Sequence, residues 1–348
     1  MNAASTLIAC LACFALLMGC IFLQFQGSGG QTGKEEVRIG YFPNMLHGQA
    51  LVGCANGAFQ EAFGPNVTVR MVPFNAGPSA IEALFAGELD LAYIGPNPAI
   101  NGYVKSGGDA LCIIAGGASG GAVLVVRNDS GISSDADFAG KTLASPQLGN
   151  TQDVALRSYI QNAGLKIGEG PGGVRVIPTA NPDILLLFQK KEIDGAWVPE
   201  PWGARLVQEG GGRIYIDERE LWPDGKFVTA NVIASKEFMG RHPDLVKRFL
   251  EAHVELTRWI NGHPEEAKAL INGQIRNITS KALAPEEMDA AFSRCDMTYD
   301  PVKSSLAKSA DDAYALGFLG AEKPDLSGIY SLSLLNEVLR EKGLEEIG

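Results

Sequence analysis

Short apolar runs alternate with helical patterns over the first two thirds of the chain. Four segments share one order: an apolar strand, a loop rich in Gly, Pro and Asn, and then a helix. The strands are expected at residues 37–42, 67–74, 89–94 and 141–146. Such alternation predicts right-handed crossover units and a parallel sheet. The four segments differ in sequence, so a solenoid of repeats is not expected.

A fifth unit of this kind begins at residues 174–179 and is followed by a helical pattern at 184–193. From residue 243 to the end the pattern is almost wholly helical, and each helix opens with Pro, Ser or acidic residues. The sequence therefore predicts an α/β front half that is braced by a helical C-terminal part.

The first 33 residues form a separate, uncharged leader, since the first charged side chain is Lys34. An apolar run at 7–17 has the length of a secretory signal and ends in a lipobox-like Gly19-Cys20. We expect a signal peptide at 1–19 and a tether at 20–33 that is lipidated at Cys20. The alternative is an uncleaved anchor over 7–25, because no Lys or Arg precedes the run and the residues after Cys20 stay apolar. Both interpretations place the body outside the cytoplasmic membrane.

Composition narrows the class of protein. Forty Asp and Glu residues against 29 Lys and Arg give a net charge of −11, which argues against a nucleic-acid partner. With 46% hydrophobic and 20% charged residues, the chain is not disordered. Its 348 residues are enough for two domains with real cores.

Neutral polar residues gather in the four loops that follow the predicted strands. In open α/β sheets, ligands bind beyond the carboxyl ends of the strands, so these loops are expected to meet at one crevice. Each loop also opens a helix, whose free N–H groups and dipole favour an anion. The alternative is that Asn, Ser and Thr there serve only as caps and turn formers. The candidate ligand-binding residues are Asn44, Met45, His47, Asn75, Gly95, Asn97, Gly149, Asn150, Thr151 and Gln152.

The segment 196–202 (AWVPEPW) adds three further candidates, Trp197, Glu200 and Trp202. Two aromatic rings and a carboxylate in a Pro-rich turn are typical of a pocket wall that covers an apolar tail. Alternatively, the Trp residues belong to a core between domains. Glu200 would repel an anion, so it points either to a zwitterionic ligand or to a structural hydrogen bond.

Cysteine and histidine patterns give no sign of a metal, a cofactor or a disulfide framework. The body holds Cys54, Cys112 and Cys295 without a CxxC motif, and no HExxH motif is present. Cys54 lies seven residues after His47, which makes a nucleophile pair conceivable, but no orienting third group is evident. His253 is expected in the helical part, either at the surface or as a capping residue.

Four motifs in order carry a family resemblance: GYFPNMLHGQALVG, FNAGPSAIEALFAGELDLAYIGPNPAI, SPQLGNTQDVALRSYI and EIDGAWVPEPWG. They resemble the substrate-binding proteins of ABC importers for aliphatic sulfonates, taurine, nitrate and pyrimidine precursors, and most closely the aliphatic-sulfonate branch. The resemblance implies a type II periplasmic-binding-protein fold. It places a discontinuous first lobe at 34–122 and 233–348, a second lobe at 123–232, and the ligand at the loops named above.

The function implied is that of a receptor, not an enzyme, that captures a small organic anion between two lobes and delivers it to an ABC permease. A monomer without cofactor is expected, tethered outside the cytoplasmic membrane through lipid or an N-terminal anchor. Helix starts at Asn97 and Thr151 would bind the head of a sulfonate, and Trp197 and Trp202 would cover its tail. A taurine, nitrate, bicarbonate or pyrimidine-precursor receptor, a sensor domain without a permease, and a desulfinase-like enzyme on the same fold remain as alternatives.

Overall fold

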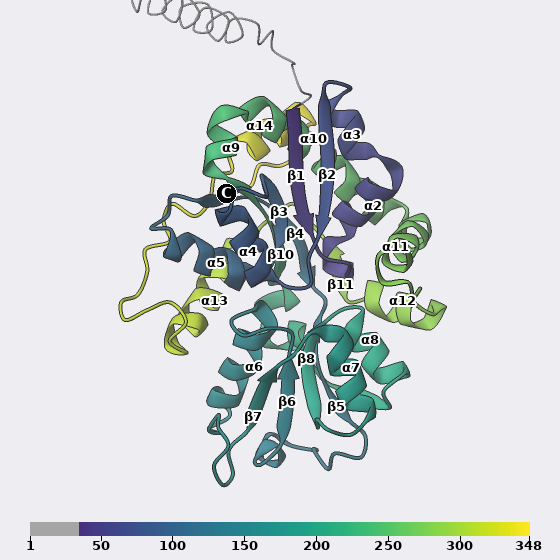
Figure 1. Ribbon diagram of the computed structural model, residues 1–348, viewed down its shortest axis with the longest axis vertical. Helices are drawn as coiled ribbons and strands as arrows, with labels where there is room; N and C mark the ends of the chain where they lie inside the picture. Colours follow the sequence, from purple (N-terminus) through teal and green to yellow (C-terminus); the bar gives the residue numbers. More distant parts are fainter. Residues whose placement is uncertain (1–34) are drawn as a thin grey trace, which may run out of the picture. The chain divides into compact units, whose positions relative to one another are not determined.

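The computed structural model describes residues 35–348, so the predicted signal peptide, Cys20 and the tether lie outside the described residues. Residues 36–348 form one compact unit. This unit contains two β-sheets with helices on their faces (Figure 1). A sheet of six strands has the order β11-β4-β10-β3-β1-β2, and a sheet of five strands has the order β7-β6-β8-β5-β9. We call each sheet with its covering helices a lobe, the six-stranded one being lobe 1.

Both lobes combine a parallel centre with antiparallel strands. In lobe 1, β1 and β3 are parallel, whereas β10 is antiparallel to both β3 and β4. In lobe 2, β6 is parallel to β7 and β8, whereas β5 is antiparallel to β8 and β9. The expected parallel crossover units are therefore present, joined by antiparallel strands. The strands are β1 Glu35–Tyr41, β2 Val67–Pro73, β3 Leu91–Ile94, β4 Leu111–Gly120, β5 Ala122–Arg127, β6 Thr142–Ser145, β7 Arg175–Pro178, β8 Gly195–Pro199, β9 Gly212–Asp217, β10 Val228–Ser235 and β11 Cys295–Met297.

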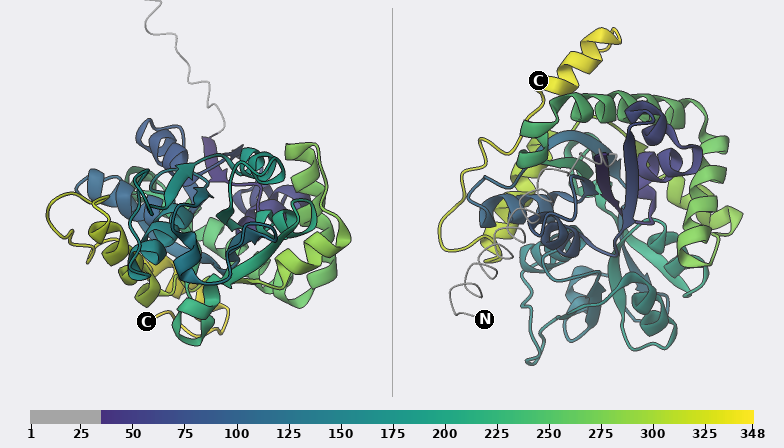
Figure 2. Two further views of the ribbon diagram at one scale, coloured as in Figure 1. Left: turned by 90° about the horizontal axis from the view of Figure 1, so that it is seen from below. Right: turned by 45° about the horizontal axis from the view of Figure 1, so that its top comes forward.

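Helices follow the strands as the sequence predicts, and the C-terminal part is helical apart from the short β11. Figure 2 shows α10, α11 and α12 following one another around lobe 1. No helix within residues 35–348 has both the length and the apolar character needed to cross a membrane. The α-helices are α2 Gly48–Asn56, α3 Ala58–Phe63, α4 Gly77–Phe85, α5 Pro96–Lys105, α6 Thr151–Asn162, α7 Asn181–Gln189, α8 Trp202–Gln208, α9 Lys236–Arg241, α10 Pro243–Gly262, α11 Pro264–Thr279, α12 Pro285–Phe292, α13 Lys303–Ala315 and α14 Ser333–Glu341. Single 3-10 turns are η1 Met45–His47, η2 Asp135–Phe138, η3 Glu218–Leu221 and η4 Pro223–Gly225.

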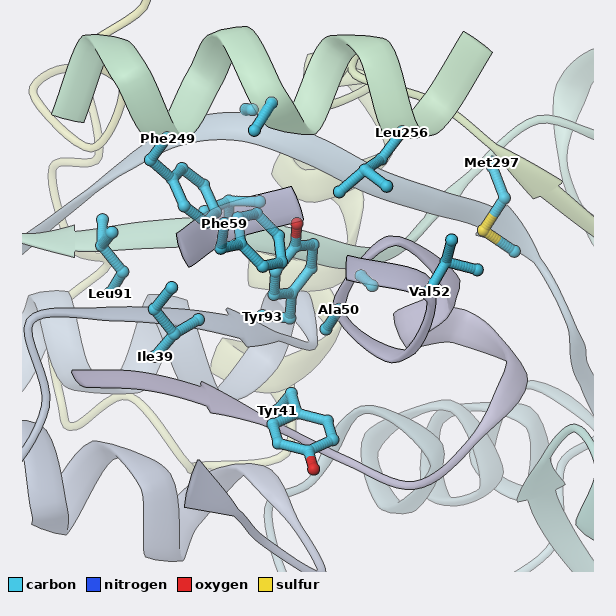
Figure 3. Packing of buried hydrophobic residues seen from close by; sticks show 14 of the residues in the cluster. Ile39, Tyr41, Ala50, Val52, Phe59, Leu91, Tyr93, Phe249, Leu256 and Met297 are labelled. Carbon is cyan, nitrogen blue, oxygen red and sulfur yellow. The ribbon is translucent and has the colours of Figure 1, made fainter. Parts of the chain in front are cut away.

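In the core of lobe 1, the apolar face of α10 packs against the sheet (Figure 3). Phe249 of α10 stacks on Phe59 of α3 with ring centroids 5.2 Å apart. His253, one turn further along α10, is fully buried in the middle of the helix, so its expected place at the surface or at a helix cap is wrong. Its Nδ1 accepts from the Tyr93 hydroxyl at 2.8 Å, and its Nε2 donates to the Gly116 carbonyl at 2.8 Å. Both ring nitrogens are thus satisfied, as burial requires.

Strands β4, β5, β8, β9, β10 and β11 were not among the predicted strands, and β4 shows a physical reason. Every residue of β4 is buried, so the strand lacks the alternation that marks a half-exposed strand. It is also rich in Gly, Ala and Ser, which resembles a loop. Its glycines allow close packing instead, since a Cβ at Gly116 would lie 2.1 Å from the carbonyl oxygen of Asp300.

The chain passes between the sheets twice. The first passage lies at Gly121, between the end of β4 at Gly120 and the start of β5 at Ala122. On the return, β10 already pairs with β4 at Val228, ahead of the predicted limit of 232–233. The domain limits themselves stay predictions.

Candidate functional site

A small cavity lies at the carboxyl ends of the parallel strands, between loops of lobe 1 and loops of lobe 2. None of its lining residues is an Asp, Glu, Lys or Arg, and most carry amides or hydroxyl groups. The lining residues are Phe42, Asn44, Leu46, His47, Asn75, Gly95, Asn150, Thr151, Gln152, Asn181, Pro199 and Thr229. Seven of the residues expected from the sequence are thus brought together here: Asn44, His47, Asn75, Gly95, Asn150, Thr151 and Gln152.

Four helices begin at this cavity. Gly95 and Asn150 are the N-cap residues of α5 and α6, and Asn181 is the first residue of α7. Asn75 lies directly before the N-cap of α4. Helix N-termini present unpaired N–H groups and the positive end of the dipole, so their convergence favours negative charge without a basic side chain.

Two amide side chains have their oxygens engaged within the protein. The Asn44 Oδ1 accepts from the Leu46 amide at 3.0 Å and caps η1. The Gln152 Oε1 accepts from the Asn150 Nδ2 at 3.3 Å. Within residues 35–348, neither the Asn44 Nδ2 nor the Gln152 Nε2 donates a hydrogen bond. Both amides therefore keep N–H donors for a ligand.

His47 lies in the cavity wall as a neutral ring. Its Nδ1 accepts from the Phe42 amide at 3.1 Å, so the ring proton is on Nε2. Burial lowers the pKa of His47 to about 3, which keeps the ring uncharged at neutral pH. The histidine thus adds a neutral donor rather than a positive charge.

Two polar atoms of the cavity wall are buried without a partner. Within residues 35–348, neither the Thr151 Oγ1 nor the Asn181 Oδ1 makes a hydrogen bond. An unpaired buried polar group costs about 1–3 kcal/mol, so such groups are uncommon unless something else satisfies them. Their position in this cavity marks it as a site that a polar ligand completes.

Asp153 holds the loop before α6 in place. Its carboxylate accepts from the Ser145 hydroxyl at 2.6 Å and from the Gly149 amide at 2.9 Å. Arg157, one turn along α6, donates to both of its oxygens at 3.0 and 2.9 Å. The charge of Asp153 is thereby paired within the protein, and the loop that presents Asn150 and Thr151 is fixed.

The cavity in this structure is nearly closed. Its volume is about 20 Å³, close to the ~10–15 Å³ that the centre of one water molecule needs. Gly95 of lobe 1 approaches Thr151 of lobe 2 so closely that a Cβ at Gly95 would lie 2.3 Å from the Thr151 Oγ1. A ligand larger than water can enter only when the two lobes separate, as they do when a hinge opens, and the lobes then close around it.

Three predicted site residues in these loops do not line the cavity. Met45 is buried in the core of lobe 1, and its amide donates to the Glu200 carbonyl at 3.0 Å. Asn97 donates from Nδ2 to the Ser309 carbonyl of α13 at 3.1 Å. Gly149 adopts a φ of +73°, and its amide donates to Asp153. All three shape the loops from behind the cavity wall.

The side chains of the AWVPEPW segment also point elsewhere. Trp197 is buried in lobe 2 and donates from Nε1 to the Glu218 Oε2 at 2.7 Å. Glu200 accepts from the Ala204 amide at 2.9 Å and from the Arg294 Nη1 at 2.8 Å. Trp202 begins α8 with the Arg205 guanidinium 4.5 Å from its ring centroid. In this closed arrangement neither indole covers the cavity. Pro199 is the one residue of the segment that lines it.

Five lining residues were not named from the sequence: Phe42, Leu46, Asn181, Pro199 and Thr229. Asn181 had a signal, because it follows the fifth predicted strand in the same strand, loop and helix order as the other four. Thr229 had none, since it lies inside β10, and its hydroxyl donates to the Ala118 and Gly120 carbonyls.

The described part of the chain shows neither a metal-binding cluster nor a Cys-His nucleophile pair. Within residues 35–348, no group of three or more His, Cys, Asp or Glu side chains is placed to hold a metal ion. Cys54 pairs with the Tyr41 hydroxyl and not with His47, and burial raises the pKa of its thiol. Cys54, Cys112 and Cys295 are free thiols.

A family model adds independent evidence to this geometry. The model of the NMT1-like family matches residues 30–273, which is more than half of the chain. The chain belongs to the NMT1-like family.

Relatives of this NMT1-like protein are named as binding proteins. It is 26% identical over 250 residues to the taurine-binding periplasmic protein of Escherichia coli, covering 72% of each chain. It is 26% identical over 286 residues to a Bacillus subtilis protein named for binding aliphatic sulfonates, covering 80% of each. The alkanesulfonate-binding protein of Xanthomonas axonopodis pv. citri, solved with bound MOPS, superposes with a TM-score of 0.71 at 17% identity, covering 86% of this chain and 98% of that one. The predicted family and the periplasmic-binding-protein fold are thereby confirmed.

Proposed function

We propose that this NMT1-like protein is the extracytoplasmic receptor of an ABC importer and binds a small anion, an aliphatic sulfonate, between its lobes. One observation carries the proposal: the starts of four helices and a set of neutral donors surround a cavity that has no charged lining residue. A sulfonate has three oxygens that accept hydrogen bonds, which suits this surplus of donors. The names of the relatives agree with this class of ligand.

The position of the two tryptophans favours a short tail. Trp197 and Trp202 do not line the closed cavity, whose volume is about 20 Å³. A long apolar tail would keep the lobes apart. The sulfonate is therefore proposed to be short, such as methanesulfonate or taurine, and a tailless oxyanion such as nitrate is the second candidate.

A thermal-shift screen tests the ligand class. Methanesulfonate, taurine, butanesulfonate, nitrate, bicarbonate and an aminopyrimidine are compared at equal ionic strength. A ligand at 100 times its dissociation constant stabilises by about 2.7 kcal/mol. We expect a shift with the short sulfonates and none with the neutral aminopyrimidine. A shift with the aminopyrimidine alone would overturn the assignment of an anion site.

Two threonine variants locate the site. Thr151→Val removes the unpartnered hydroxyl, so the shift with methanesulfonate is expected to shrink while the free protein stays folded. Thr279→Val is the matched control, because its hydroxyl is bonded to the Ile275 carbonyl in α11, outside the cavity. Equal shifts in both variants would place the ligand elsewhere.

The receptor role is separated from an enzyme role by analysing the ligand after binding. A receptor returns the sulfonate unchanged, whereas a desulfinase-like enzyme releases sulfite from a sulfinate. Localisation outside the cytoplasmic membrane and lipid attachment at Cys20 belong to the same proposal. Cys20→Ser is expected to abolish incorporation of labelled fatty acid; an uncleaved anchor would leave the chain membrane-bound and unlabelled with either residue.

A further inference from the structure

A second pocket lies between α6, the turn η3 and α13, and shares no lining residue with the cavity described above. Its volume is about 260 Å³, large enough for a small organic molecule. Its residues come from both lobes, since α6 and η3 belong to lobe 2 and α13 packs on α5 of lobe 1. The lining residues are Ala155, Ser158, Tyr159, Asn162, Trp197, Glu218, Leu221, Trp222, Lys308 and Asp312.

Aromatic rings form much of the wall. Tyr159 and Trp197 pack together with ring centroids 5.7 Å apart. Trp222 stacks on Phe227 with centroids 5.3 Å apart and ring planes within 3° of each other, which fixes its orientation. Rings held in this way offer π faces without a further loss of side-chain freedom on binding.

A buried carboxylate lies at this aromatic wall. Glu218 is 4% exposed, and its two oxygens accept from the Trp197 Nε1 at 2.7 Å and from the Trp222 Nε1 at 3.4 Å. No ion pair within residues 35–348 includes Glu218, so the carboxylate has neutral donors but no cation. A buried carboxylate without a counterion is costly, and a cation in the pocket would remove that cost.

The other charges of the pocket leave a net negative balance. Lys308 forms an ion pair with Asp312 at 2.6 Å and lies 5.1 Å from the ring centroid of Trp222. Asp217, next to Glu218, is paired with Arg219 at 2.7 Å. Above about pH 7, where Glu218 is ionised, the lining residues therefore carry the negative charges of Glu218 and Asp312 against the one positive charge of Lys308.

We propose that this pocket binds a small organic ammonium ion with apolar substituents, which contacts the Trp222 and Tyr159 rings and is neutralised by Glu218. Cation–π attraction and a buried counterion both favour such a ligand over a neutral one. Inorganic cations fit less well, because aromatic rings form much of the wall and cannot replace the water ligands of such an ion. The anion cavity and this pocket share no lining residue, so an experiment can refute ligand binding at one of them without refuting it at the other.

Protonation of Glu218 makes binding of the ammonium ion depend on pH. Burial raises the pKa of Glu218 to about 7; the bonds from Trp197 and Trp222 and the charge of Lys308 lower it, and Asp217 raises it. Asp312 of α13 and the Tyr159 hydroxyl are the remaining titratable groups of the pocket. The protonated carboxyl carries no charge, so the ammonium ion should bind more tightly as the pH rises from 6 through about 7 to 8.

The test compares choline with its neutral carbon isostere, 3,3-dimethylbutan-1-ol, on the purified full chain. Binding is followed by calorimetry and tryptophan fluorescence at constant ionic strength. We expect saturable binding of choline that is about tenfold or more tighter than that of the isostere. Equal binding of both probes, or no saturable binding of choline, would overturn the proposal.

Variants assign the site. Glu218→Gln keeps an acceptor for Trp197 and should weaken choline about tenfold and abolish the dependence on pH. Trp222→Leu should weaken choline while retaining the carboxylate, and it tests the pocket independently if Glu218→Gln does not fold. Lys308→Met removes a competing cation and should tighten binding. Trp259→Phe, on α10 and outside the pocket, is the control. Unchanged choline affinity in both Glu218→Gln and Trp222→Leu would place choline elsewhere.

Discussion

Glu200 is buried where the lobes meet, and its charge partner comes from the protein. Its side chain is 0% exposed and lies 2.8 Å from the Arg294 Nη1, while its backbone carbonyl accepts from the Met45 amide of the first cavity loop. Burial raises the pKa of Glu200, and the Ala204 amide and Arg294 act in the opposite direction. The sequence left two interpretations of Glu200, a partner for a zwitterionic ligand or a structural hydrogen bond. This geometry supports the structural hydrogen bond. The backbone carbonyl of Glu200 holds the loop of Asn44 and His47 against lobe 2, and its carboxylate holds Arg294 of lobe 1.

Removing Arg294 is therefore expected to be costly. Arg294→Met leaves the Glu200 carboxylate buried without a cation, which typically destabilises by about 3–5 kcal/mol. The double variant Glu200→Gln with Arg294→Met removes the charge as well and should recover most of that loss. Urea unfolding of wild type, both single variants and the double variant measures the coupling. A loss in Arg294→Met below 1 kcal/mol would show that the pair behaves like an exposed ion pair.

Glu218 also predicts how stability depends on pH. Its pKa in the folded protein is about 7 against an ordinary value of 4.5, so the folded state binds the proton more strongly. Its contribution is fully present below pH 4.5 and is lost as the pH rises through 7. The free energy of unfolding should fall by about 3 kcal/mol over this range from this group alone.

Other buried groups oppose this slope, so the measurement must isolate Glu218. Burial lowers the pKa of His47 to about 3 and that of His253 to about 4, and both raise stability with pH up to the ordinary histidine value. Urea unfolding of wild type and Glu218→Gln between pH 5 and 8 gives a difference from which the histidines cancel. A difference that does not change with pH would mean that Glu218 keeps an ordinary pKa.

At the scale of elements, the repeated order of strand, loop and helix is what predicts well. Strands β1, β2, β3, β6 and β7 and helices α4 to α7 lie where the pattern places them, because each of these helices begins at a Gly, Pro or Asn loop. The fully buried β4 was missed because its Gly, Ala and Ser residues resemble a loop, whereas the equally buried β3 was predicted because a Gly-Pro-Asn loop and a helix follow it. Side-chain direction was also beyond the pattern: Trp197 is buried in the core of lobe 2, and only Pro199, the last residue of β8, reaches the cavity. Thr229 reaches the cavity through the pairing of β10, which local sequence does not reveal.

The meeting of α5 and α6 across the lobes yields a test of closure. Gly95 has an ordinary φ of −69°, so Gly95→Ala carries no backbone strain. Its Cβ would, however, lie 2.3 Å from the Thr151 Oγ1 of the other lobe. We expect a protein of near-normal stability that closes poorly and binds methanesulfonate about tenfold more weakly. Small-angle scattering with saturating ligand should show a larger radius of gyration than in wild type.

Two further variants control for this effect. Gly240→Ala adds a Cβ to α9 with nothing within 4 Å, so closure should be unchanged. Combining Gly95→Ala with Thr151→Ala removes the clashing oxygen, and the compact state should return even though affinity stays low. A Gly95→Ala protein that compacts like wild type would show that the loops relax without cost.

At the scale of the whole molecule, an acidic protein is proposed to bind an anion. The net charge of −11 repels the ligand at long range, whereas the helix starts attract it within the cavity. The two effects differ in reach. Salt screens repulsion over tens of ångströms but acts little inside a closed cavity that has no charged lining residue.

Association and dissociation rates should therefore respond differently to salt. Raising the ionic strength from 0.01 to 0.15 M shortens the screening length from about 30 to about 8 Å. The association rate of methanesulfonate should rise about twofold or more, because the repulsion by the acidic surface is screened. Its dissociation rate should stay nearly constant. Stopped-flow tryptophan fluorescence measures both rates, and zwitterionic taurine is the control, since its association should change little. An association rate of methanesulfonate that falls with salt would show that a local positive field steers the ligand despite the net charge.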